Sequence, residues 1–156
     1  MQATVSRAGM VYVDDSEMGW QPYTESWLAR AEPEAKETLR GLIERCIPKL
    51  VSIKEGRCKE PVPLAALGGV RSLCLMYEAF ATKANGVEPK EDGHARIVEL
   101  WFLFCTIWSL GGTVDDESRK DIDAAMRELD AQIPHKDSVY DYFVNVKDKR
   151  FAACLA

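Results

Sequence analysis

The stretch ARIVELWFLFCTIWSL at residues 95–110, followed by Gly111-Gly112, decides the fold class of this chain. Large apolar side chains point in nearly every direction around a helix drawn through it: Leu100, Trp101, Phe102, Leu103, Phe104, Ile107 and Trp108. Such a helix is buried on all sides, and this one is too short to span a bilayer. The sequence therefore predicts a central core helix that ends at the glycine pair.

Helical patterns precede this stretch. Pro22 and Pro33 each stand where a first helical turn is expected, and the second of these helices carries an apolar stripe over residues 39–51. Pro48 is expected to kink that helix. Residues 52–62 are charged and without periodicity, and we expect a solvated loop there. A third helix is predicted from about Leu64, with Asn85-Gly86 as a left-handed stop.

One further helix is predicted after the glycine pair. Thr113 or Asp115 is expected to cap it, and acidic residues fill its first turn, which suits the positive end of the helix dipole. Its apolar stripe consists of Ile122, Met126, Leu129 and Ile133. We expect the four tryptophans to fill the core rather than to bind a ligand: Trp20, Trp27, Trp101 and Trp108.

Residues 4–13 and 139–146 are rich in β-branched and aromatic side chains and predict a short strand near each end of the chain. Neither has a partner strand in the predicted pattern, so we expect poorly satisfied backbone donors and acceptors in both. The predicted fold class is mainly α, a helical bundle with short β segments at both ends.

Composition excludes several classes of function. The net charge of -5 gives no broad basic surface, which disfavours nucleic acid as a partner. The five cysteines are odd in number and lack a Cys-x-x-Cys pair, so we interpret them as buried thiols in a reducing compartment rather than as disulfides or metal ligands. The first residues lack a signal-peptide pattern, and neither secretion nor a membrane partner is expected.

No motif for complete catalytic chemistry is present. An ATPase of the phosphate-loop type needs a glycine-rich loop that ends in Gly-Lys-Ser or Gly-Lys-Thr, and the sequence has none. We interpret Gly68-Gly69 as a close approach of two helices and Gly111-Gly112 as a helix terminator. Neither His94 nor His135 has an obvious nucleophile partner.

Ordered motifs along the chain resemble the heavy chains of dyneins. Residues 3–12 (ATVSRAGMVY), with Gly19-Trp20, Pro22 and residues 26–28 after them, resemble a segment in the second AAA+ module of the six-module motor ring. Residues 100–104, 107–112 and 118–120 resemble the late helices of that module, and residues 139–144 (VYDYFV) resemble the start of the third module. Residues 70–74 and 140–142 are more similar to axonemal than to cytoplasmic dyneins. Ala8 departs from the pattern, since the family often has a cysteine there.

The resemblance implies a domain organisation and two site residues. Residues 1–15 would end a large AAA+ subdomain, residues 16–134 would form the helical lid of the second module, and residues 135–156 would enter the third. Arg7 matches the arginine finger that acts in trans on ATP bound by the first module. Arg71 lies near the position of a lid arginine that senses nucleotide. The residues alone favour a solvated Arg7 beside a turn and a surface salt bridge for Arg71.

The resemblance also implies a function and partners. The parent protein would be an ATP-driven, minus-end-directed microtubule motor in the cytoplasm and cytoskeleton, in a cilium or flagellum axoneme. Its cofactors would be ATP or ADP with Mg, and this chain alone would be inactive. The implied partners are the neighbouring AAA+ modules of the same chain and, through the parent, light and intermediate chains and microtubules. The alternative is a free-standing helical protein–protein interaction module derived from a dynein-like gene.

Overall fold

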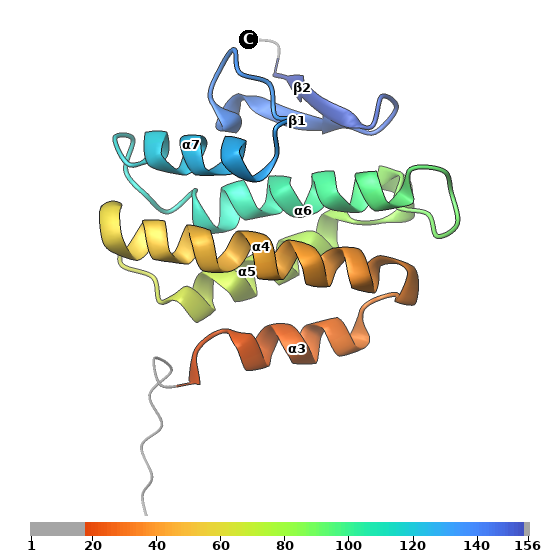
Figure 1. The fold of residues 1–156 in the computed structure, drawn as a ribbon, viewed down its shortest axis with the longest axis horizontal. Helices are drawn as coiled ribbons and strands as arrows, with labels where there is room; N and C mark the ends of the chain where they lie inside the picture. The colour runs from red at the N-terminus through yellow and green to blue at the C-terminus, as the bar shows by residue number, and fades with distance from the viewer. Residues whose placement is uncertain (1–17, 155–156) are drawn as a thin grey trace, which may run out of the picture.

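The computed structural model describes residues 18–154, which form five α-helices and one β-hairpin (Figure 1). The helices are α3 (Gln21–Arg30), α4 (Pro33–Arg57), α5 (Ala66–Phe80), α6 (His94–Leu110) and α7 (Arg119–Leu129), and the strands are β1 (Tyr142–Asn145) and β2 (Arg150–Ala153). Short 3-10 helices are η1 (Lys83–Asn85) and η2 (Val139–Asp141). The predicted mainly α bundle is confirmed, whereas the strand predicted in residues 4–13 lies outside the described residues.

Helix α6 lies at the centre of the molecule, as its sequence predicts. It packs on α4 and α5 and also contacts both strands of the hairpin. Ile97, Leu103 and Cys105 are fully buried in it. Trp101 is also buried, but the prediction that Trp108 fills the core is wrong, because its side chain is 40% exposed and rests edge-on against Tyr140.

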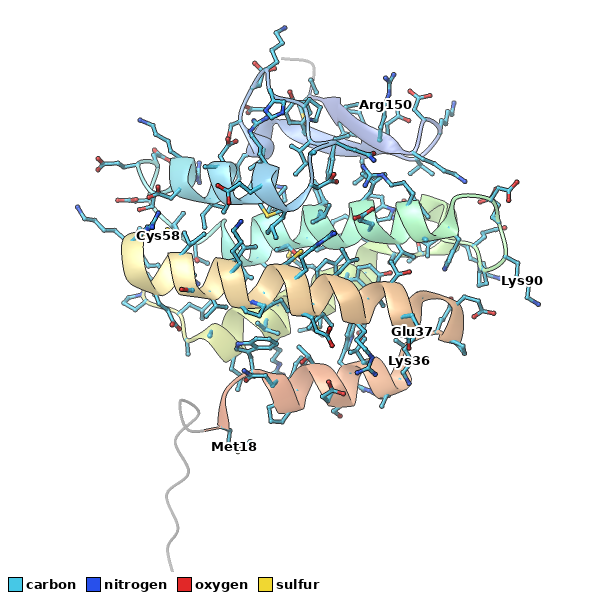
Figure 2. All side chains as sticks on the ribbon, viewed as in Figure 1. Met18, Lys36, Glu37, Cys58, Lys90 and Arg150 are labelled. Atoms are coloured by element: carbon cyan, nitrogen blue, oxygen red, sulfur yellow. The ribbon has the colours of Figure 1, made fainter. Side chains whose placement is uncertain are left out.

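Helix α3 and the hairpin lie at opposite edges of a stack of helices, where Figure 2 labels Met18 and Arg150 respectively. Helix α3 packs on α4 and α5 through Trp27 and Leu28, which are both buried. Proline stands in the first turn of both α3 and α4, where its missing N–H costs no hydrogen bond. These two helix starts are confirmed.

The predicted loop at residues 52–62 is partly wrong, because α4 continues through Pro48 and ends only at Arg57. The apolar stripe continues to Lys54, a residue on the same face as Leu50 and Ile47, and the Lys54 side chain is only 4% exposed. An ion pair with Glu60 replaces the solvent that we expected around this lysine. The chain is irregular from Cys58 to Ala65.

The glycine stops and caps are close to their predicted places. Gly86 has a positive φ of 77° but ends the 3-10 helix η1, since α5 itself ends at Phe80. The predicted terminator Gly111 follows α6 directly. The Asp115 carboxylate accepts a hydrogen bond of 2.9 Å from the Ser118 amide in a turn that precedes α7, so the acidic run lies before the helix rather than in its first turn.

The expectation of an unpaired C-terminal strand is wrong. Strand β1 pairs antiparallel with β2, and the register aligns Tyr142 with Ala153 and Asn145 with Arg150. Residues 150–153 read RFAA and carry no β-branched side chain, so their own sequence gives a weak strand signal. Packing on α6 stabilises the strand although its β-propensity is low, because Val144 and Phe151 are each only 5% exposed.

Candidate functional site

The two predicted site residues have different outcomes. Arg7 lies outside the described residues. Arg71 lies in the second turn of α5 on its exposed face, near the exposed Leu75, and forms no ion pair or side-chain hydrogen bond within residues 18–154. The surface salt bridge weighed for Arg71 is therefore not seen there. Its proposed contact with nucleotide stays a prediction.

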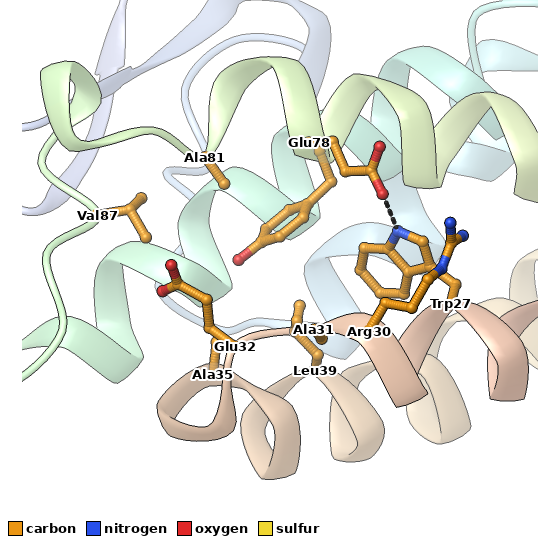
Figure 3. Close-up of a pocket in the computed structure, with 10 residues that line it drawn as sticks. Trp27, Arg30, Ala31, Glu32, Ala35, Leu39, Glu78, Ala81 and Val87 are labelled. Atoms are coloured by element: carbon orange, nitrogen blue, oxygen red, sulfur yellow. Dashed lines mark hydrogen bonds between the residues drawn. The ribbon is translucent and has the colours of Figure 1, made fainter.

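A pocket of about 220 Å³ opens between α3, the start of α4 and the end of α5, and we name it the α3–α5 pocket (Figure 3). Its lining consists of Trp27, Arg30, Ala31, Glu32, Ala35, Leu39, Tyr77, Glu78, Ala81 and Val87. The Trp27 indole donates a hydrogen bond of 2.8 Å to Glu78 Oε1, and the rings of Trp27 and Tyr77 meet edge to face at 5.7 Å. Two buried aromatic rings therefore meet charged groups at one opening.

The electrostatics of this pocket are dominated by carboxylates. Glu32 and Glu78 carry two negative charges against the one positive charge of Arg30, and all three side chains reach solvent. Burial raises the pKa of the Tyr77 hydroxyl, and the negative charge of Glu32 adds to the rise. The Tyr77 hydroxyl is therefore protonated at neutral pH and is available as a hydrogen-bond donor.

A second polar cluster links the end of α4 to the segment that follows α6. Lys54 Nζ lies 2.8 Å from Glu60 Oε1, and the Thr113 hydroxyl donates to the same carboxylate oxygen at 2.7 Å. Burial alone would raise the pKa of Glu60, but Lys54, Thr113 and the Leu64 amide outweigh burial and hold that pKa below its ordinary value. The carboxylate is thus ionised and paired.

A third cluster holds the hairpin to α7, and we name it the Arg127 lock: Asp123, Arg127, Pro134, Asp137 and Val139. Arg127 Nε donates to Asp123 Oδ2 at 2.7 Å, and its two terminal nitrogens donate to the carbonyl oxygens of Pro134 and Asp137. Asp123 Oδ1 also accepts from the Val139 amide at 2.6 Å. Burial would raise the pKa of Asp123, yet Arg127 and the Val139 amide outweigh it and lower the pKa. One guanidinium therefore fixes the segment that leads from α7 to β1.

Tyr140 completes this attachment. Its hydroxyl donates a hydrogen bond of 2.9 Å to the Gly111 carbonyl at the end of α6. The Arg119 guanidinium lies 5.1 Å from the centre of the Tyr140 ring, a distance typical of a cation–π contact. The C-terminal hairpin is thus bonded to both α6 and α7, so these elements form one unit.

Sequence reasoning missed the α3–α5 pocket and the Lys54–Glu60 pair. The pocket takes its residues from four separate segments, and no one of them carries a recognisable motif. Lys54 did give a signal, because a charged residue stands on the buried stripe of α4 four positions after Leu50. A lysine on the buried stripe, followed by a glutamate in the next loop, indicates an ion pair between the two.

Two classes of feature are not found in the part of the chain that the structure describes. No group of three or more His, Cys, Asp or Glu side chains is arranged to hold a metal ion among residues 18–154. No helix in this range is both long and apolar enough to cross a membrane. All five cysteines are free, and Cys46, Cys74 and Cys105 are buried as predicted, whereas Cys58 is half-buried and Cys154 is exposed.

Comparison with known proteins finds one family whose model matches most of the chain. The family described as "Dynein heavy chain AAA lid domain" matches residues 39–153. These residues include α5, α6, α7, the hairpin and most of α4, so the matched range contains the Lys54–Glu60 pair and the Arg127 lock.

Curated relatives agree with this match. Dynein axonemal heavy chain 2 of Homo sapiens is 45% identical over 146 residues, which cover 93% of this chain and 3% of the relative. Dynein-1-beta heavy chain, flagellar inner arm I1 complex, of Chlamydomonas reinhardtii is 35% identical over 188 residues, which cover 97% of this chain and 4% of the relative. Dynein beta chain, ciliary, of Tripneustes gratilla is 30% identical over 156 residues, which cover 96% and 3% respectively. This chain therefore spans only a few per cent of the length of these relatives.

Proposed function

This chain belongs to the dynein heavy chain family through its AAA lid domain, and from this premise we propose that it is the helical lid of the second AAA+ module in the motor ring of an axonemal heavy chain. The placement in the second module rests on residues 3–12, 100–112 and 139–144. On this proposal residues 1–15 end the large subdomain, residues 16–134 form the lid, and residues 135–156 lead into the third module.

The proposed task is mechanical transmission, and the observation that carries it is how polar contacts join the hairpin, α7, α6 and α4. The Arg127 lock and the Tyr140 hydroxyl attach the hairpin to α7 and α6, while the Lys54–Glu60 pair attaches α4 to the same end of α6. A bundle that is connected in this way moves as a rigid body. A nucleotide-driven shift of α3 or α5 would then reach the hairpin, which leads to the third module on this proposal.

Arg7 is proposed to act in trans on ATP in the first module. A guanidinium at that position would neutralise part of the negative charge that develops on the transferred phosphoryl group. ATP or ADP with Mg would be bound by the parent protein. Arg71, on the exposed face of α5, is proposed to approach nucleotide from the lid side of the second module.

The test of Arg7 uses the intact heavy chain. Arg7→Ala should lower ATP turnover at the first module by about 10³-fold or more, the usual effect of losing an arginine finger. Arg7→Lys should not restore it, because a lysine lacks the planar fork of the guanidinium. Arg40→Ala is a matched control, since Arg40 forms only an exposed pair with Glu25. Unchanged turnover in Arg7→Ala would remove this role.

Location and partners follow the relatives' names. We propose that the parent protein works in the axoneme of a cilium or flagellum, where its AAA+ modules pack around one ring and the lid contacts its neighbours in the same chain. Microtubules and the light and intermediate chains would be contacted by other parts of the heavy chain. The heavy chain should be detected in isolated axonemes by an antibody raised against residues 18–154.

A further inference from the structure

The α3–α5 pocket contains a tyrosine hydroxyl that the lid role does not use. Tyr77 lines the pocket and is 93% buried, since only 7% of its surface is exposed. Within residues 18–154 its hydroxyl has no hydrogen-bond partner, whereas the Trp27 indole N–H on the same wall is satisfied by Glu78. The Tyr77 ring is buried, whereas its hydroxyl oxygen reaches the open side of the pocket, where water can bond it. A ligand that enters the pocket can therefore take the place of water at this hydroxyl.

The charged groups around the pocket determine whether it favours a cation or an anion. Figure 3 shows the Glu32 carboxylate at the end of the pocket near Val87, while Glu78 and Arg30 lie at the other end with Trp27. Glu32 forms no ion pair within the part of the chain that the structure describes. An unpaired carboxylate in the same pocket as the Tyr77 hydroxyl offers two oxygen acceptors to a cation and repels an anion.

The walls between the two ends of the pocket determine which chemical group the ligand carries besides its charge. They are formed by the side chains of Ala35, Leu39, Ala81 and Val87 and by the aromatic rings of Trp27 and Tyr77. A space of about 220 Å³ accepts a short alkyl chain. Aromatic faces also attract an ammonium group, and an aliphatic stem gains from lying along apolar side chains.

We propose that the α3–α5 pocket binds an alkylammonium group, supplied either by a lysine side chain of another polypeptide segment or by a free amine. The ammonium donates to the Glu32 carboxylate and to the Tyr77 hydroxyl oxygen, and the alkyl stem lies against Leu39 and the Trp27 ring. This binding does not depend on the lid role proposed above, because every group in it belongs to residues 27–87.

The test is a titration of the 156-residue chain followed by the NMR signal of the Trp27 indole N–H. The probes are n-butylammonium chloride, Nα-acetyl-lysine methylamide, and 1-butanol as a neutral molecule of similar size, with sodium chloride to control for ionic strength. Both cations should shift the signal saturably, and 1-butanol and sodium chloride should not. Tighter binding of the lysine derivative would assign the site to a polypeptide partner, and tighter binding of butylammonium would assign it to a free amine.

Two variants assign the contacts. Glu32→Gln should weaken binding of both cations about tenfold, the usual effect of losing a charge-assisted hydrogen bond. Tyr77→Phe should weaken binding of both cations several-fold. This variant keeps the aromatic ring in place, so it still tests the proposal if Glu32→Gln alters the fold. Glu34→Gln is the matched control, because Glu34 is an exposed glutamate in the first turn of α4 that does not line the pocket. A shift from 1-butanol equal to that from butylammonium, or unchanged affinity in both variants, would overturn the proposal.

Discussion

Lys54 is a lysine buried within the bundle. It is 4% exposed and paired with Glu60, so Lys54→Met should leave the half-buried Glu60 carboxylate without its cation. We expect the free energy of unfolding to fall by about 3 kcal/mol, measured by urea denaturation.

Lys49→Met is the control for this change. Lys49 forms an exposed pair with Glu128, and such pairs contribute about 0 to 1 kcal/mol. Equal losses in the two variants would show that burial of Lys54 does not determine its effect.

Glu60 should make the stability of the chain depend on pH in the acid range. Its pKa in the folded state lies below the ordinary value of 4.5, so the unfolded chain binds the proton more readily. The contribution is therefore complete above about pH 4.5 and is lost as the pH falls through the lower folded pKa. The difference in unfolding free energy between the natural chain and Glu60→Gln should shrink from pH 7 to pH 3. A difference that stays constant over this range would contradict the pairing.

At the scale of residues, sequence reasoning recovered the apolar core better than the polar contacts. The burial of Trp27 and Trp101 follows from helical periodicity, which is a local property. The exposure of Trp108 and the burial of Lys54 depend on which elements pack nearby. The lining of the α3–α5 pocket depends on four segments that meet only in the folded chain, so no local pattern predicts it.

Two glycines in different elements should respond oppositely to alanine. Gly41 lies inside α4, where an added Cβ meets nothing within 4 Å, so Gly41→Ala should stabilise the chain by about 0.5 to 1 kcal/mol. At Gly111 an added Cβ would lie 2.6 Å from both the Ile107 carbonyl oxygen and the Tyr140 hydroxyl. Gly111→Ala should therefore destabilise the chain by about 2 kcal/mol. Thermal unfolding of both variants checks the two signs.

The Arg127 lock should control local opening of the hairpin. Arg127→Met keeps an aliphatic stem but removes the bonds to Asp123 and to the Pro134 and Asp137 carbonyl oxygens. We expect hydrogen exchange of the Val139 amide and of β2 to speed up about tenfold or more, while amides at the centre of α6 keep their rates. Arg45→Met, which removes a more exposed pair with Glu99, should leave the hairpin unchanged. Equal acceleration throughout the chain would indicate global rather than local loosening.

At the scale of elements, helix starts and the central helix were predictable because proline, glycine and apolar periodicity act within a few residues of sequence. The end of α4 and the strand β2 were not. In both places a distant partner overrides local preference: Glu60 pairs with Lys54, and β1 and α6 hold the RFAA segment as a strand. Tertiary contacts of this kind have no signature in a single stretch of sequence.

At the scale of the whole molecule, one hydrophobic core around α6 joins α4, α5 and the hairpin. The three polar features described above lie around this core: the α3–α5 pocket between α3, α4 and α5, the Lys54–Glu60 pair at the end of α4, and the Arg127 lock between α7 and the segment before the hairpin. This arrangement fits a lid that transmits motion from one module to the next. The family match and the axonemal relatives support the proposal that this lid is one part of a much longer motor protein.

The central claim is that this sequence works as one part of a dynein heavy chain, and the size of the native polypeptide tests it most directly. An antibody raised against residues 18–154 would be used on an immunoblot of cells that express the sequence. The account predicts a band many times heavier than the 17.5 kDa of this chain. A single band near 17.5 kDa would contradict it and would favour the free-standing helical interaction module.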